Sequence, residues 1–224
     1  MIPCRAVAKH GQVIASVGGA VVASDLDGNV QWIRRQWWRP PQENLMRVGE
    51  YFSLPAVADG RVFVPQPNVG YVECLSAESG RLLWRHRDPQ LLRIFDCHQQ
   101  RLIVQRADGF AALDPQSGDV LWRRPDDRIL EGFSWGPDGE FVYTRNEQLS
   151  SGQWQPELVW LDPRTGNETH RSPLASLAST GRRPIEPLFG PLADVDGRLF
   201  AFFDSRVKSR STVRRVVELG PAKK

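Results

Sequence analysis

One pattern occurs four times in this chain and restricts its fold more than any other feature does. It consists of an apolar run, an acidic turn that closes on glycine, and an aliphatic stretch that ends in an aromatic residue. The copies span residues 21–32, 71–84, 110–122 and 158–170. Their turn glycines are Gly28, Gly80, Gly118 and Gly166, so the intervals between copies are 52, 38 and 48 residues. Repeats of this length indicate a chain built from stacked supersecondary units.

Each copy has the composition of a β-hairpin. Short apolar runs flank a turn of Asp, Pro, Ser and Gly, and glycine ends the turn because that position usually requires a positive φ. A second hairpin precedes most copies, with turns at Asp59 and Gly60, Asp138 and Gly139, and Asp196 and Gly197. Two hairpins per repeat predict a four-stranded sheet, and no helical stripe of comparable length is present. We therefore expect an all-β chain.

A four-stranded sheet of this kind cannot bury both of its faces alone, so neighbouring sheets must stack on it like the blades of a β-propeller. Tryptophan closes three copies, at Trp32, Trp84 and Trp122, and its large ring suits a place between adjacent blades. We expect a single propeller domain or fragment over residues 1–224, with about five blade units. The expected units are residues 10–38, 50–87, 91–124, 131–171 and 187–220. Because a strand-like run at residues 13–17 follows Met1 closely, we expect no structure before it.

The closing turns carry the motif Ala/Leu-Asp-x-x-Ser/Thr-Gly-x-x-x-Trp. Asp114, Gly118 and Trp122 match all of it, and Asp162 and Gly166 match its first part. The motif resembles the repeat of the quinoprotein-like β-propellers, the pyrroloquinoline quinone repeat family. That resemblance implies a bacterial, extracytoplasmic protein and a full ring of about eight blades. The chain is therefore expected to be a partial or small propeller, and further blades of a longer propeller are possible partners.

The resembled family includes quinone-dependent dehydrogenases and an outer-membrane assembly lipoprotein without a cofactor. Its dehydrogenases hold pyrroloquinoline quinone with a calcium ion, often beneath a pair of adjacent cysteines. The three cysteines here, Cys4, Cys74 and Cys97, are not adjacent, and we expect them to act as small buried apolar residues. Most aspartates lie in the repeated turns, where a turn role already explains them. We expect no catalytic, cofactor-binding or metal-binding residue, with pyrroloquinoline quinone and calcium as the alternative that the resemblance implies.

Charge and hydropathy exclude some other functions. The net charge of +3 is modest, and acidic residues are interspersed throughout, which does not indicate a nucleic-acid partner. No apolar run is long enough to span a bilayer. The first residues lack the apolar core of a signal peptide, so the compartment stays open and the resemblance alone favours an extracytoplasmic one.

One segment, residues 33–47, departs from the repeat and lengthens the first unit. Its paired tryptophans are interleaved with arginines, which is the composition of interface hot spots. The candidate partner-binding residues are Arg34, Arg35, Trp37, Trp38 and Arg39. In the alternative interpretation, the tryptophans cover the open side of a blade and the arginines solvate its rim.

Two functions fit these observations. The first is a non-catalytic propeller that binds a protein or peptide through the loops of one face. The alternative is a fragment of a quinone-dependent dehydrogenase whose active-site blades lie outside this chain. The missing cysteine pair and the lack of an assignable calcium site favour the first.

Overall fold

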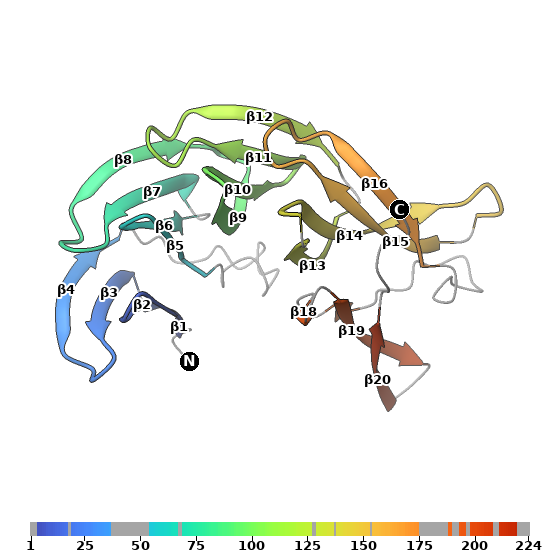
Figure 1. Cartoon of the computed structure of the whole chain (residues 1–224), viewed down its shortest axis with the longest axis horizontal. Helices are drawn as coiled ribbons and strands as arrows, with labels where there is room; N and C mark the ends of the chain where they lie inside the picture. The colour runs from blue at the N-terminus through green and yellow to red at the C-terminus, as the bar shows by residue number, and fades with distance from the viewer. Residues whose placement is uncertain are drawn as a thin grey trace. The chain divides into compact units, whose positions relative to one another are not determined.

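The computed structural model describes residues 4–17, 19–36, 54–66, 69–126, 129–136, 138–152, 154–174, 188–189, 193–195, 198–207 and 211–218. Within these ranges all the regular secondary-structure elements are β-strands. They form five antiparallel sheets (Figure 1). The prediction of an all-β chain is thus confirmed for the described residues. The chain divides into two units, Met1–Pro125 and Asp126–Lys224, which we describe in turn.

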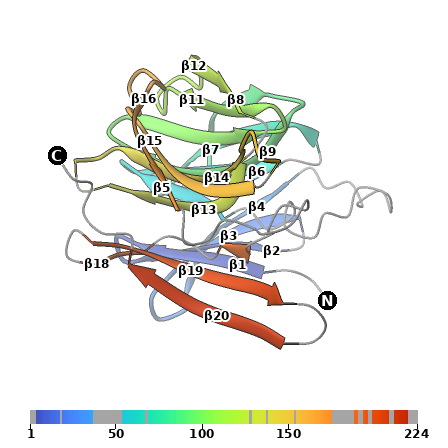
Figure 2. The ribbon, with the colours of Figure 1, turned by 90° about the vertical axis from the view of Figure 1, so that its right-hand side faces the viewer.

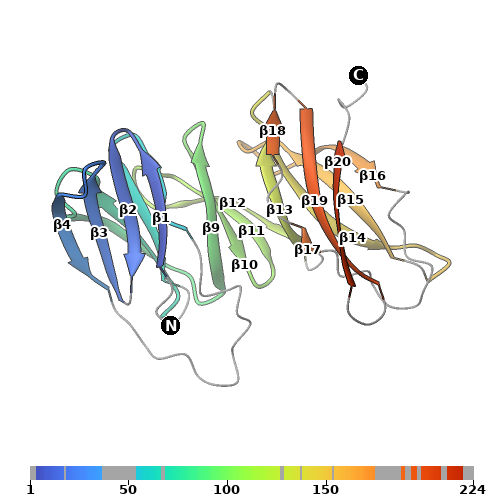
Figure 3. The ribbon, with the colours of Figure 1, turned by 90° about the horizontal axis from the view of Figure 1, so that it is seen from below.

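The first unit contains three sheets, in each of which the strand order follows the chain. The first sheet comprises β1 (Cys4–Lys9), β2 (Gln12–Val17), β3 (Ala20–Asp25) and β4 (Val30–Arg35), which lie side by side in Figure 3. The second comprises β5 (Ala56–Ala58), β6 (Arg61–Gln66), β7 (Tyr71–Ser76) and β8 (Leu82–Arg87). The third comprises β9 (Leu91–His98), β10 (Arg101–Arg106), β11 (Gly109–Leu113) and β12 (Val120–Pro125).

The second unit contains two sheets that differ in pattern. The fourth sheet repeats the earlier order, with β13 (Ile129–Trp135), β14 (Phe141–Gln148), β15 (Trp154–Leu161) and β16 (Glu168–Pro173). The fifth comprises β17 (Leu188–Phe189), β18 (Ala193–Val195), β19 (Arg198–Val207) and β20 (Ser211–Glu218). Here β17 and β18 pair with successive parts of one edge of β19 (Figure 3), while β20 pairs along the other edge of β19 (Figure 2).

The first sheet begins earlier than the sequence indicated. Strand β1 pairs with β2 over its whole length, for example Ala6 with Ala15, so the expectation of no structure before residue 13 was wrong. The expected first unit began at residue 10, which is in fact the first residue of the turn between β1 and β2. His10 and Gly11 have φ values of 52° and 76°, the backbone of a two-residue hairpin turn. A short strand of small residues is hard to detect from sequence because its apolar signal is weak.

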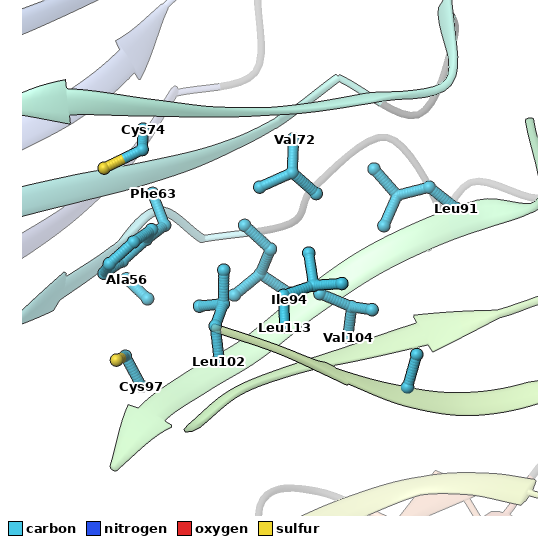
Figure 4. Close-up of a cluster of buried hydrophobic side chains, with 11 residues drawn as sticks. Ala56, Phe63, Val72, Cys74, Leu91, Ile94, Cys97, Leu102, Val104 and Leu113 are labelled. Atoms are coloured by element: carbon cyan, nitrogen blue, oxygen red, sulfur yellow. The ribbon is translucent and has the colours of Figure 1, made fainter. Parts of the chain in front are cut away.

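The sheets of the first unit pack face to face through two buried clusters. One joins the first and second sheets through Ile14, Val21, Val62 and Leu75. The other joins the second and third sheets, and Figure 4 shows its side chains directed toward one another from both sheets. Cys74 and Cys97 are part of this cluster as free, buried thiols, which confirms their predicted apolar role. The unit is thus a stack of sheets with an apolar core between each successive pair.

Candidate functional site

The repeated tryptophans connect successive sheets of the first unit. Trp32 on β4 lies against Gly80 in the closing turn of the second sheet, so close that a Cβ added to Gly80 would be 2.6 Å from the indole Cε3. The indole Nε1 of Trp32 donates a hydrogen bond to the carbonyl oxygen of Ala77, at 2.7 Å. Trp84 on β8 repeats this contact with Gly118, and its Nε1 donates to the Pro115 carbonyl oxygen at 3.1 Å. Each indole therefore holds the turn of the next sheet along the chain.

The turn aspartates use their carboxylates locally. Asp114 accepts the backbone N–H of Gln116 at 2.6 Å, and Asp162 accepts that of Arg164 at 2.9 Å. The backbone hydrogen bond from Arg164 is the largest cause that lowers the pKa of Asp162. Gly118 and Gly166 follow in these turns with φ values of 82° and 72°, the left-handed conformation expected for them. These carboxylates therefore stabilise turns.

The aromatic residues that end the third and fourth copies lie on the strands that follow the closing turns. Trp122 is on β12 of the third sheet and is partly buried. In the fourth sheet the slot of the tryptophan is filled by His170, whose ring centroid lies 4.9 Å from that of Trp160 on the neighbouring strand. The fourth copy thus replaces an indole by an imidazole that packs on its own sheet.

The described residues do not fit the calcium site of the dehydrogenases. Among them, no group of three or more His, Cys, Asp or Glu side chains is arranged to hold a metal ion. The aspartates of the repeat are engaged by backbone amides, as shown above.

The candidate partner-binding segment begins at the end of β4. Arg34 is half-buried, and its Nε lies 3.8 Å from Oε2 of Glu73, a buried carboxylate on β7 of the second sheet. Glu73 also accepts a hydrogen bond from Nε of Arg85, at 2.9 Å. Arg35 is exposed. The other three candidates, Trp37, Trp38 and Arg39, lie outside the described residues.

A buried ion pair lies where the chain passes from the second sheet to the third. Asp88 follows β8, Arg106 ends β10, and the Arg106 guanidinium donates to the Asp88 carboxylate. Arg106 also donates from Nε to Asp108 at 2.8 Å and from Nη2 to Gln90 at 2.9 Å. Both partners of the pair are less than one tenth exposed, so the guanidinium is buried with its hydrogen bonds satisfied.

The fourth sheet repeats this arrangement within the second unit. Arg145 on β14 lies with Nη1 3.6 Å from Oδ2 of Asp126, and its Nε is 3.1 Å from Oε2 of Glu157. The hydroxyl of Tyr143 donates to Asp126 at 2.6 Å. An aspartate before the first strand and an arginine on the second strand therefore recur as a buried pair.

Glutamine occupies both of the corresponding positions in the first two sheets, Gln36 after β4 and Gln66 at the end of β6. The backbone N–H of Gln36 donates to the Gly19 carbonyl at 2.8 Å, as the N–H of Asp88 donates to the Gly70 carbonyl at 2.8 Å. Gln36 is therefore the counterpart of Asp88. It directly follows the arginine pair at the end of β4.

Gln66 ends β6 as Arg106 ends β10, so it is the counterpart of the arginine. Its side chain is 6 % exposed, and within the described part of the chain neither Nε2 nor Oε1 has a hydrogen-bond partner. Nε2 of Gln36 and Nε of Arg34 are also buried, and neither has a hydrogen bond to a residue that the structure describes. An unpaired buried polar group costs about 1–3 kcal/mol. The amide of Gln66 is therefore unused hydrogen-bonding capacity at the position where Arg106 and Arg145 form buried ion pairs in the third and fourth sheets. This cluster was not predicted from the sequence. A sequence alignment of β6 with β10, the second strands of their sheets, would have placed Gln66 at the position of Arg106.

The fold defines the class of this protein. Four-stranded antiparallel sheets that follow one another along the chain, joined by indole-to-turn contacts, are typical of β-propellers of the quinoprotein-like kind. The chain belongs to the family described as outer membrane protein assembly factor BamB, whose model matches residues 19–211. The predicted family and fold class are thereby confirmed. No curated protein sequence matches the chain.

Two solved structures with TM-scores above 0.5 show the same fold at low sequence identity. A europium-containing methanol dehydrogenase is 15% identical with a TM-score of 0.58, over 90% of this chain and 48% of the other. The quinohemoprotein alcohol dehydrogenase from Comamonas testosteroni is 15% identical with a TM-score of 0.53, over 96% of this chain and 42% of the other. BamB from Moraxella catarrhalis is 16% identical with a TM-score of 0.47, over 88% of this chain and 59% of the other. The chain spans less than two thirds of the length of these three proteins. Within the described ranges, the chain forms no helix that is long and apolar enough to cross a membrane.

Proposed function

We propose that this chain is a non-catalytic, extracytoplasmic propeller module that binds an extended segment of a protein or peptide at the ends of β4 and β6. Membership of a family named for an assembly factor of outer membrane proteins supports a role in protein interaction. The same membership supports the extracytoplasmic location.

The observation that carries the proposal is the buried side-chain amide of Gln66, which has no hydrogen-bond partner among the described residues. A carboxamide has donors on nitrogen and an acceptor on oxygen. A peptide backbone offers both complementary groups, so one peptide unit can satisfy Gln66 on both sides. The corresponding position in the third sheet offers no such capacity, because Arg106 there is already paired with Asp88.

Charge near this position favours an acidic segment. Arg34 lies near Glu73, which also accepts from Arg85, so these charges partly cancel one another. Arg35 adds an exposed positive charge, and Arg39 follows it in the sequence with the tryptophan pair. Arginine and tryptophan are the residues most enriched among those that dominate binding energy. We expect the preferred segment to contain carboxylates and a large apolar side chain.

The proposal is tested by selecting peptides from a random displayed library on the immobilised 224-residue chain. The selected peptide is then synthesised and titrated calorimetrically. Gln66→Met keeps the size and burial of the side chain but removes the amide, and should weaken binding about tenfold, the effect of losing about 1.4 kcal/mol. Arg35→Glu should also weaken binding of the same peptide, and the loss of affinity should be larger at low salt than at high salt.

The matched control is Gln148→Met, the same change at an exposed position on β14, which should leave the affinity unaltered. A library that yields no binder would overturn the proposal. So would a selected peptide that binds Gln66→Met and the unaltered chain equally well.

The alternative, a fragment of a quinone-dependent dehydrogenase, is supported by the likeness of fold to two dehydrogenases. It is tested by incubating the chain with pyrroloquinoline quinone and calcium, removing free cofactor, and measuring retained quinone absorbance and dye reduction with alcohols. Retention with turnover would support the alternative over the binding module.

A further inference from the structure

Glu73 on β7 is held between two arginines from neighbouring outer strands. Its side chain is 2% exposed, and Oε2 lies 3.8 Å from Nε of Arg34 on β4 of the first sheet. Oε1 accepts a hydrogen bond at 2.9 Å from Nε of Arg85 on β8, which pairs with Glu73 in its own sheet. The first two sheets therefore enclose one carboxylate between two cations.

His86 occupies on β8 the position that Arg34 occupies on β4. Each lies two residues after a tryptophan, and these tryptophans, Trp32 and Trp84, cover the closing turns of the second and third sheets. Alternate residues of a strand share a face, so each side chain lies on the face of the preceding indole, toward the next sheet along the chain. His86 therefore faces the third sheet as Arg34 faces the second.

The third sheet supplies the second cation but not the carboxylate. Arg123 on β12 pairs with Ala111 on β11. This is the register in which Arg85 pairs with Glu73, and both arginines directly follow the closing tryptophan of their sheet. Ala111 is 1% exposed and packs in the cluster between the second and third sheets. A methyl group therefore lies where the second sheet has a carboxylate.

The bonding capacity of His86 and Arg123 is not used within the described part of the chain. Nε2 of His86 is buried and has no hydrogen-bond partner there. Arg123 is exposed and forms no ion pair with a described residue. Asp88, whose charge acts on the imidazole, is already paired with Arg106. The two cations are therefore present without the anion that their counterparts share.

The surroundings of His86 disfavour its protonation. Burial is the main cause that lowers its pKa, and the charges of Arg123 and Arg106 lower it further. The charge of Asp88 and a hydrogen bond with the backbone of Gly118 act in the opposite direction. A carboxylate bound beside the ring would favour the protonated form, in which both ring nitrogens are donors.

We propose that His86 and Arg123 bind the carboxylate of a ligand, as the two arginines bind the carboxylate of Glu73. Nε2 of the protonated imidazole donates to one carboxylate oxygen, and the guanidinium pairs with the charge. Both side chains lie on the outermost strands of their sheets (Figure 1), where His86 is half-buried and Arg123 is exposed, so a change of side-chain rotamer opens the site to solvent. The ligand is a small organic acid or the acidic side chain of a peptide, because both present the same group.

The test follows the four histidines of the full chain by NMR during pH titrations. One series contains acetate and the other contains chloride at the same ionic strength, and His86→Asn identifies the signal of residue 86. Acetate should bind the protonated form at least about tenfold more tightly, so the midpoint of the His86 titration should move upward by about one pH unit. His10, His98 and His170 are exposed, so their titrations provide an internal control and should not move.

Two variants at exposed arginines test the role of the guanidinium. Arg123→Gln should remove most of the displacement, measured as the difference between the acetate and chloride series of the same variant. Arg87→Gln is the matched control, because it makes the same change at an exposed position on the face of β8 opposite His86. It should leave the displacement unaltered.

Ala111→Glu should supply the carboxylate from within the chain. The midpoint of the His86 titration should then rise in chloride and should no longer respond to acetate. Should this variant fail to fold, the comparison of Arg123→Gln with Arg87→Gln still decides the proposal.

Two blocked peptides, Gly-Glu-Gly and Gly-Gln-Gly, distinguish the sources of the carboxylate. A larger displacement by Gly-Glu-Gly than by acetate at equal concentration would assign the site to an acidic peptide segment. A larger displacement by acetate would assign it to a small organic acid. Gly-Gln-Gly, which lacks the charge, should have no effect.

The proposal is wrong if His86 titrates identically in acetate and in chloride. It is also wrong if Arg123→Gln and the unaltered chain respond equally to acetate, or if the exposed histidines move as far as His86. Neither His86 nor Arg123 takes part in the peptide-binding proposal, so these results would leave binding near Gln66 unaffected.

Discussion

Trp32 and Gly80 lie on different sheets, 48 residues apart in the sequence, and the indole occupies the space that a side chain at residue 80 would need. The hydrogen bond from Trp32 Nε1 to Ala77 O fixes the orientation of the ring over the turn. Glycine is therefore required at residue 80 for two reasons, the left-handed backbone and the close approach of the ring.

The two reasons can be separated by comparing Gly80→Ala with Gly60→Ala. Both glycines have positive φ, of 67° and 69°, but an added Cβ at Gly60 meets no atom of the described residues within 4 Å. Gly60→Ala should cost about 1–2 kcal/mol of unfolding free energy from the backbone alone. Gly80→Ala should cost about 1–3 kcal/mol more because of overpacking. Urea denaturation of both variants measures the difference, and equal losses would show that the indole yields without cost.

The buried pair of Asp88 and Arg106 predicts strong non-additivity. Arg106→Gln leaves the Asp88 carboxylate, which is 4% exposed, without its main partner and should cost about 3–5 kcal/mol. Changing both residues to glutamine reproduces the combination found at Gln36 and Gln66, and should recover a large part of this loss. A double-mutant cycle by urea denaturation gives the coupling energy. Additive losses would mean that the pair is not a unit.

Gln66→Met should make the chain more stable. It removes a buried amide that has no partner in the described part of the chain, and methionine has a similar volume, so unfolding free energy should rise by about 1–3 kcal/mol. Gln148→Met, at an exposed position, should change stability by less than about 0.5 kcal/mol. Thermal and urea denaturation provide the measurement. A loss of stability on Gln66→Met would show that the amide is satisfied in solution.

The partly buried side chain of His86 should make the unfolding free energy depend on pH. Burial is the main cause that lowers its pKa below 6.5, and a nearby Asp88 raises it less. The folded chain therefore binds the proton more weakly than the unfolded chain. Stability should be fully present above about pH 7.5 and should fall as the pH drops through the unfolded pKa toward the folded one.

The urea midpoint between pH 5 and pH 8 measures this slope, and His86→Asn should reduce it. At pH 8 the ring is neutral in both states, so the same variant there reports the loss of packing alone. An unchanged slope in the variant would assign the pH dependence to other groups.

The closing turns could be predicted from sequence because they depend on local chemistry. Gly80 and Gly118 need a left-handed backbone, and Asp114 organises its own turn, whatever the rest of the chain does. The turn at Gln99 and Gln100 was not predictable in this way. Both residues have positive φ, of 47° and 56°, although neither is glycine, so the pairing of β9 with β10 imposes the turn.

The polar pairs between sheets could not be predicted, because they depend on which strands meet in space. Asp88 and Arg106 are 18 residues apart and are brought together only when the third sheet forms. In the sequence, Gln66 is an ordinary polar residue at the end of a strand. Only the folded structure shows that its side chain is 6 % exposed and that its amide has no hydrogen-bond partner among the described residues.

In the first four sheets every strand pairs with its neighbours in the sequence, so each sheet can form as soon as its own residues have left the ribosome. Such local pairing closes only short loops and favours rapid folding during synthesis. The indole contacts observed in the first unit, in contrast, depend on a sheet that is synthesised later. Trp32 contacts Gly80, which lies 48 residues further along the chain. During translation, the most recently synthesised of these sheets therefore exposes its indole until the following sheet emerges. In that interval the exposed indole is available for binding by a chaperone.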